Sequence, residues 1–252
     1  MFRHWLSVMI LTVLGAHAVA DTHLTLVGGG VRPKAALKAF VSHVTPSRSI
    51  WVLPWGTAFP KESFETIKAE LLDLGPFDVR CACDLTIDLA TLKEIEEAGG
   101  YYFPGGNQNL IIDRLVQTDL LSLIRNKFAS GTPVAGTSAG TAIQSDPMLT
   151  GDGSNLGAGL GLLSGFLVDQ HFWVRKREER LLAALNELRV LNHEVKVGLG
   201  IDENMAVQIT NGTHFQALGP SRISFYQWNS TSAKFDKKDL FDHDEIDVIT
   251  SF

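Results

Sequence analysis

The sequence predicts an α/β protein in which helices flank a mainly parallel sheet within a single domain. Short apolar runs alternate with longer amphipathic stretches through the first half of the chain, and this alternation is typical of βαβ units. Several apolar runs end in glycine-rich turns, at residues 28–30, 105–106 and 136–140. Because the carboxyl ends of parallel strands meet at one edge of a sheet, we expect these turns to line a common cleft.

Hydrophobic spacing gives each expected element in order. Strands are expected at residues 24–27, 50–53, 79–83, 101–103, 134–135, 197–201 and 205–209. Helices are expected at 33–44, 63–74, 89–98 and 175–190, with a further amphipathic stretch at 110–128. Asn211-Gly212 predicts a hairpin turn.

Two segments show no clear period. The glycine-rich segment 146–165 is expected to be a loop draped over the cleft. Residues 230–252 are polar and acidic, and we expect a poorly ordered C-terminal tail there. The folded domain is therefore expected to span residues 21–229.

Composition limits the function classes. The chain has 252 residues, 45% of them apolar and 20% charged, which is ordinary for a globular protein. A chain of this length can bury a full core without metal or disulfide staples. The formal net charge of −6 offers no positive field for nucleic acid. We therefore expect no nucleic-acid partner.

Residues 1–20 have the pattern of a secretory signal peptide. Arg3 and His4 form a basic start, residues 6–14 are apolar, and Ala18-Val19-Ala20 is a small-x-small sequence before Asp21. The apolar stretch is too short to cross a bilayer. The alternative is an uncleaved amphipathic or membrane anchor. We expect a periplasmic or secreted protein without membrane contact after cleavage.

The only cysteines, Cys81 and Cys83, lie on one face of an expected strand. Export makes a disulfide possible, although a bridge between residues two apart is strained. Neither a histidine nor another cysteine lies nearby at metal-ligand spacing, so no metal site is expected.

Residues 136–140, GTSAG, fit the G-x-S-x-G pattern of a nucleophile on a strained strand-to-helix turn. The flanking glycines let strand and helix approach closely, and the helix directs backbone N–H groups toward developing negative charge. Ser138 is therefore the candidate nucleophile. The alternative is an ordinary serine in a tight turn.

The sequence FPGGNQ, residues 103–108, ends another expected strand in two glycines. The N–H groups of Gly106 and Ala139 are the candidate oxyanion donors, and Gln108 would then contact substrate. The alternative is a plain turn with Asn107 as a helix N-cap.

A serine nucleophile needs a base and an acid that orients it. His171, within a polar DQH cluster just after the apolar run GFLV, is the candidate base. Glu203 ends the GIDE sequence and is the first candidate acid, with Asp152 as its rival and Asp202 as a weaker one.

Three arginines follow the candidate base: Arg175, Arg177 and Arg180. Such a run usually forms a solvated helix face. Beside a candidate base, the arginines could instead bind a substrate carboxylate, because the guanidinium fork matches both carboxylate oxygens.

Taken together and in this order, FPGGNQ, GTSAG, DQHF with R-x-R, and GIDE resemble peptidase family S51, particularly its cyanophycinase-like members. The resemblance covers about residues 24–209. It implies a flavodoxin-like fold related to class I glutamine amidotransferases, without cofactor or metal, and a triad of Ser138, His171 and Glu203. The positions it implies for substrate contact are Gln108, Asp169, Gln170, Arg175, Arg177 and Arg180, with Asn107 beside them.

The resemblance implies substrates with aspartate next to the scissile bond, and cyanophycinase itself releases β-Asp-Arg dipeptides. The chain departs from the family at Asn107, where aspartate is common, at Thr141, where alanine is common, and in a shorter segment before DQHF. We expect an exported serine-type exopeptidase or dipeptidase that acts on Asp-containing peptides. The sequence leaves open whether it is a monomer or a homodimer.

Two alternatives remain. An α/β-hydrolase esterase would use Ser138, Asp202 and either His214 or His243 in chain order. A non-catalytic periplasmic binding protein would keep the cleft without turnover.

Overall fold

The computed structural model describes residues 20–84, 86–151 and 153–248. The expected signal peptide lies outside the described residues except for Ala20, and Asp152 lies outside them too. No helix within the described ranges is long and apolar enough to cross a membrane.

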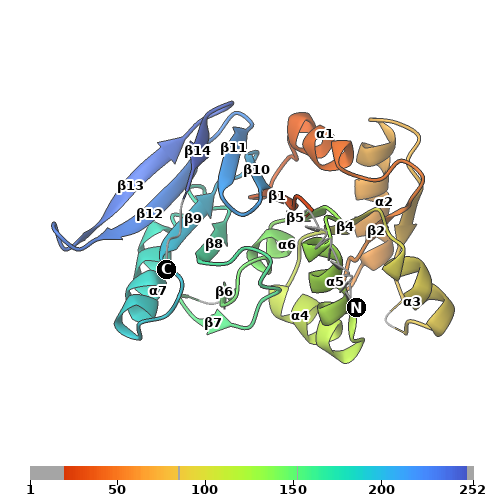
Figure 1. Ribbon diagram of the computed structural model, residues 1–252, viewed down its shortest axis with the longest axis horizontal. Helices are drawn as coiled ribbons and strands as arrows, with labels where there is room; N and C mark the ends of the chain where they lie inside the picture. Colours follow the sequence, from red (N-terminus) through yellow and green to blue (C-terminus); the bar gives the residue numbers. More distant parts are fainter. Residues whose placement is uncertain (1–19, 85, 152, 249–252) are drawn as a thin grey trace, which may run out of the picture.

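An eight-stranded sheet forms the centre of the molecule, in the order β14-β11-β10-β1-β5-β4-β2-β3 (Figure 1). Its parallel strands are β1 (His23–Val27), β2 (Ile50–Val52), β3 (Val79–Cys81), β4 (Gly100–Phe103) and β5 (Val134–Thr137). Its antiparallel strands are β10 (Ala206–Thr210), β11 (His214–Leu218) and β14 (Glu245–Asp247). The predicted mixed α/β domain with a mainly parallel central sheet is confirmed.

Helices cover both faces of the parallel strands. The helices of this half are α1 (Lys34–Ser42), α2 (Pro60–Leu72), α3 (Leu89–Glu96), α4 (Gln108–Gln117), α5 (Leu120–Ala129) and α6 (Ala139–Ala142). Ile50 and Val52 pack in one cluster with α1 and α2. Trp51 packs in another with α3, α4 and α5, because successive strand residues point to opposite faces. Burial on both faces explains why these strands read as continuous apolar runs.

A second sheet packs beside β11. It consists of β8 (Phe166–Gln170), β9 (Val197–Ile201), β12 (Ile223–Asn229) and β13 (Lys234–Leu240), in the order β13-β12-β9-β8. Phe215 on β11 contacts Phe166 and Phe225, with ring centroids 5.1 and 5.3 Å apart. Helix α7 (Glu178–Val190) buries Leu181 and Leu185 against this second sheet (Figure 1). The sequence pattern predicted β9 at its observed bounds but not that it belongs to a separate sheet.

Three expected elements differ from the structure. The stretch at 110–128 is two helices, because Asp119 between them adopts a left-handed conformation, φ 59°. The helix expected from residue 175 begins at Glu178, after a turn in which Lys176 has φ 52°. The glycine-rich segment contains a short hairpin, β6 (Met148–Leu149) and β7 (Leu156–Gly157), and buries Leu160 and Leu163 in the core. It is therefore packed rather than loosely draped.

The expectation of a poorly ordered tail at 230–252 is wrong for its described part. Strand β13 pairs with β12, and β14 pairs with β11 through Phe215 and Ile246. Lys237 on β13 forms ion pairs with Glu178 and Asp239. The charged side chains that suggested disorder belong to an edge strand and are mostly exposed, while Leu240 enters the core.

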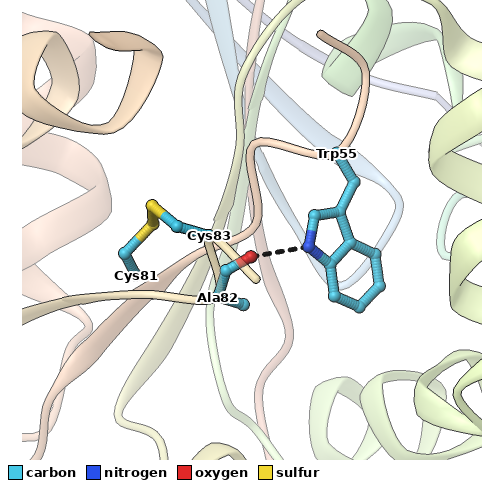
Figure 2. Close-up of a disulfide and its surroundings, with 4 residues drawn as sticks. All are labelled: Trp55, Cys81, Ala82 and Cys83. Atoms are coloured by element: carbon cyan, nitrogen blue, oxygen red, sulfur yellow. Dashed lines mark hydrogen bonds between the residues drawn. A yellow bond between two sulfur atoms is a disulfide. The ribbon is translucent and has the colours of Figure 1, made fainter. Parts of the chain in front are cut away.

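The two cysteines are joined by a disulfide at the end of β3 (Figure 2). Their Cα atoms are 5.1 Å apart. The sequence had left their oxidation state open.

The Leu240→Ala and Phe241→Ala variants test the role of the C-terminal strands. Leu240 is 2% exposed and Phe241 is 54% exposed. Removing the buried side chain is expected to lower the free energy of unfolding by about 2–5 kcal/mol, whereas Phe241→Ala changes it by less than about 0.5 kcal/mol. Denaturant unfolding measures both values. Equal, small effects would mean that the segment does not pack in solution.

Candidate active site

Ser138 lies on a strained turn between β5 and α6. Its backbone has φ 54° and ψ −113°, and its N–H donates to the Val27 carbonyl at 2.9 Å. A Cβ at Gly136 would lie 2.2 Å from the Gly140 oxygen, and one at Gly140 would lie 1.9 Å from the Phe103 oxygen. The two glycines therefore allow the close approach of strand and helix that the motif predicts.

Thr141 anchors this turn from inside. Its side chain is buried, and its hydroxyl lies 2.7 Å from the Val27 carbonyl oxygen and 2.9 Å from that of Gly136. Alanine at this position could not make either contact. Sequence reasoning marked Thr141 only as a departure from the family pattern and missed this anchoring contact.

The side chains of Ser138, His171 and Glu203 form one hydrogen-bonded line. Ser138 Oγ lies 2.7 Å from His171 Nε2, and His171 Nδ1 contacts Glu203 Oε1. The carboxylate fixes the tautomer in which Nδ1 carries the proton, so Nε2 faces the hydroxyl as an acceptor. This arrangement can remove a proton from Ser138.

The backbone of residues 28–30 supports the imidazole of His171. The His171 N–H donates to the Gly28 carbonyl at 2.8 Å, and the Asn204 N–H donates to the Gly29 carbonyl at 2.9 Å. A Cβ on Gly29 would lie 2.2 Å from His171 Cε1. The ring therefore rests directly on the Gly29 backbone. The sequence indicated a cleft at this turn but missed its supporting role, for which three consecutive glycines were the only signal.

The turn at Gly105 and Gly106 faces the candidate nucleophile. A Cβ on Gly105 would lie 3.7 Å from Ser138 Oγ, so substrate could approach the hydroxyl closely there. No described residue accepts a hydrogen bond from the N–H of Gly106 or of Ala139. Both amides are thus available to a ligand, and their role as oxyanion donors stays a prediction.

Electrostatics favour a neutral imidazole. Burial lowers the pKa of His171 below its ordinary value of 6.5, the hydrogen bond to Glu203 opposes this, and the positive charges of Arg175 and Arg177 lower the pKa further. A neutral His171 at pH 7 can act as a general base.

Two of the three arginines are held by a buried carboxylate. Asp169 is fully buried and accepts hydrogen bonds from the Arg180 Nε at 2.7 Å and from Arg180 Nη2. Arg177 Nη1 donates to the Gln170 carbonyl at 2.7 Å and approaches Asp169 at 3.4 Å. Burial, together with the neighbouring arginine charges, lowers the pKa of Arg177 to about 10. Asp169, Arg177 and Arg180 thus bind one another, and the substrate contacts that the family resemblance implies for them stay a prediction.

Arg175 differs from its neighbours. It is exposed, and no hydrogen bond or ion pair joins its side chain to the parts of the chain that the structure describes. Gln170, buried beside His171, has an Oε1 without a hydrogen-bond partner within the described residues. Arg175 therefore retains a charge that a substrate carboxylate could pair with, whereas the Gln170 oxygen is buried.

The other predicted contact residues take structural roles. Asn107 caps α4, because its Oδ1 accepts from the N–H of Asn109 at 2.9 Å and of Leu110 at 3.4 Å. Gln108 is buried and donates to the Leu149 carbonyl at 3.0 Å. Asn107 is therefore the N-cap of α4, which is the alternative that the sequence had left open.

The residues of the esterase alternative are not brought together. Asp202 accepts from the N–H groups of Trp173 and Val174 and from Ser221. His214 contacts Asp247, and His243 lies near Asp242. The rival acid Asp152 is outside the described residues.

Within residues 20–84, 86–151 and 153–248, no cluster of three or more His, Cys, Asp or Glu side chains is placed to hold a metal ion.

Comparisons with known proteins agree on one family. The model described as "Peptidase family S51" matches residues 58–217. The chain is 28% identical over 224 residues to a cyanophycinase of Trichormus variabilis, covering 81% of this chain and 72% of that protein. It is 29% identical over 148 residues to a cyanophycinase of Geminocystis herdmanii, covering 55% of this chain and 53% of that protein.

Solved structures show the same fold. A peptidase from an acI-B1 Actinobacterium has a TM-score of 0.68 and 19% identity, covering 91% of this chain and 97% of that one. A putative peptidase E protein from Listeria monocytogenes has a TM-score of 0.58 and 20% identity, covering 80% and 100%.

The Gly29→Ala variant tests the backbone support of the imidazole. The added Cβ displaces the His171 ring, and a misplacement of about 1 Å can lower activity by about a hundredfold. Gly212→Ala is the control, because Gly212 also has a positive φ, 67°, but nothing lies within 4 Å of its Cβ position. Turnover and thermal unfolding are measured for both. Equal losses of turnover would show that backbone strain, rather than contact with His171, causes the effect.

Proposed function

The chain belongs to peptidase family S51 and is a serine-type peptidase of the cyanophycinase-like kind, and we propose that Ser138, His171 and Glu203 are its catalytic triad. The observation that carries this proposal is the distance of 2.7 Å between Ser138 Oγ and His171 Nε2, together with the contact from His171 Nδ1 to Glu203.

The proposed mechanism follows from these contacts. Ser138 Oγ attacks the peptide carbonyl carbon while His171 Nε2 takes the hydroxyl proton, and Glu203 stabilises the resulting imidazolium. The N–H groups of Ala139 and Gly106 bind the negative oxygen of the tetrahedral intermediate. His171 then gives this proton to the leaving amine as the C–N bond breaks. In the second half-reaction Nε2 takes a proton from water, the water oxygen attacks the acyl carbon, and the proton passes to Ser138 Oγ as the ester bond breaks.

We also propose that the substrate is an Asp-containing peptide, with the aspartyl or β-aspartyl group next to the scissile bond. Exposed Arg175, four residues after the base, supplies a guanidinium for a carboxylate. The relatives named cyanophycinase support the same substrate class.

Export to the periplasm or beyond the cell is the proposed setting. The signal-like pattern at residues 1–20 supports it. The Cys81–Cys83 disulfide supports it independently, because disulfides persist mainly in oxidising compartments.

Ser138→Ala and Glu203→Gln test the triad. Ser138→Ala is expected to lower kcat by roughly 10⁶-fold, to near background, with an unchanged unfolding transition. Glu203→Gln is expected to lower kcat by about 10²- to 10⁴-fold, because the imidazole loses the partner that orients it. Asp152→Asn should have a much smaller effect. The opposite order of the last two variants would make Asp152 the triad acid, and full activity of Ser138→Ala would exclude a serine nucleophile.

Arg175→Gln tests the substrate class, with the neighbouring exposed cation variant Lys176→Gln as control. Losing a charge-assisted contact lowers kcat/KM for an Asp-containing peptide by about ten- to a hundredfold, while hydrolysis of a neutral activated ester at alkaline pH hardly changes. For the ester, the acidic limb of kcat/KM lies below pH 6.5 in the wild type. Removing the positive charge of Arg175 raises the pKa of His171 and moves this limb to higher pH. Equal loss with both substrates would contradict a role in carboxylate binding.

A further inference from the structure

The disulfide at the end of β3 encloses a hydrogen-bonded residue. Cys81 and Cys83 flank Ala82, whose carbonyl accepts from the indole Nε1 of Trp55 at 2.6 Å (Figure 2). The Ala82 N–H donates to the Val52 carbonyl at 2.9 Å. The bridge therefore restricts a peptide segment that is bonded on both sides, and it fixes the direction of the Ala82 carbonyl.

Trp55 links the Ala82 carbonyl to the turn beside Ser138. Its ring is fully buried, and the residue after it, Gly56, accepts a hydrogen bond from the Asn107 N–H at 2.7 Å. A Cβ on Gly106 would lie 2.2 Å from the Gly56 oxygen, so the two backbones are in direct contact. Gly105 in the same turn faces Ser138 Oγ. Any shift of residues 55–56 therefore shifts the turn beside the nucleophile.

The disulfide can be reached from solvent. Cys81 and Cys83 are half-buried, and Cys83 lines an open cavity of about 320 Å³ together with Thr57, Asp84 and Arg114. A small dithiol can therefore approach the disulfide from the side of Cys83.

We propose that the Cys81–Cys83 disulfide and Trp55 position the turn at Gly105 and Gly106, and that reduction of the disulfide lowers turnover. The inference rests on the proposed oxyanion role of the Gly106 N–H. In the redox step, a dithiol reductant transfers two electrons and two protons to the disulfide. The S–S bond breaks, two thiols form, and the reductant becomes a cyclic disulfide.

Reduction is expected to act on kcat rather than on KM. Without the bridge, the peptide around Ala82 gains conformational freedom, the Trp55 indole loses a fixed acceptor, and the Gly106 N–H moves relative to the oxyanion. A misplaced donor weakens binding of the transition state more than binding of the substrate. If the protein is exported, full turnover then depends on reaching an oxidising compartment.

The experiment uses the full chain and a neutral activated ester. Treatment with dithiothreitol and alkylation, followed by mass spectrometry, shows how much of the disulfide is reduced. We expect kcat to fall by about ten- to a hundredfold with little change in KM, and to recover on reoxidation of the unalkylated protein. The double variant Cys81→Ser with Cys83→Ser should have the same low kcat and no response to dithiothreitol.

Trp55→Phe provides a second variant with the disulfide intact. It removes the N–H donor but keeps an aromatic ring, so we expect a reduced kcat and an unchanged KM. Trp228→Phe, on β12 of the second sheet, is the matched control and should keep the wild-type kcat. If the cysteine variant unfolds at the assay temperature, Trp55→Phe decides the result.

Two outcomes would overturn the inference: an unchanged kcat after complete reduction, or a rise in KM at constant kcat, which would make the cavity a binding subsite. Neither outcome affects the triad, which Ser138→Ala tests separately. Activity in Ser138→Ala would instead reject the proposed function on which this inference rests.

Discussion

The backbone at the carboxyl end of β1 holds the candidate active site together. Three successive carbonyls, those of Val27, Gly28 and Gly29, accept the N–H groups of Ser138, His171 and Asn204. These partners come from separate parts of the chain. Ser138 and Asn204 lie beside β1 because β1 pairs with β5 on one side and with β10 on the other, whereas His171 follows β8 of the second sheet. A side chain at Gly29 would occupy the place of the His171 ring. The absence of a Cβ is therefore a geometric requirement of the site.

A buried ion pair fixes the segment that follows the imidazole. Asp169 has no exposure to solvent. Its carboxylate forms ion pairs with Arg180 and, at 3.4 Å, with Arg177. Removing one partner of such a group would leave an uncompensated buried charge, which is strongly unfavourable. This pairing orients the turn after β8, whereas Arg175 in that turn stays exposed. Its positive charge acts on His171 through space, in the same direction as burial.

Local sequence patterns predicted most of the first half of the fold. The apolar runs at β1, β2 and β4 are buried on both faces, so their composition carries a strong signal. The pattern failed where composition and hydrophobic spacing do not reveal the structure. The charges of β13 resemble those of a solvated tail, and only pairing with β12 and burial of Leu240 make the segment a strand. The break at Asp119 depends on one residue with positive φ, which hydrophobic spacing does not reveal.

The sequence by itself determined the chemical groups of the site: the serine between two glycines, the histidine at a strand end, and the glutamate after GID. Each follows an apolar run, so the local sequence alone marks it as a polar group at a strand end. Tertiary structure decided which polar residues are bound by other groups of the chain. Asn107 became a helix cap, Gln108 bonded Leu149, and Asp169 bound two arginines. The sequence could not distinguish these roles, because a buried polar group takes whichever partner the packing places within hydrogen-bonding distance.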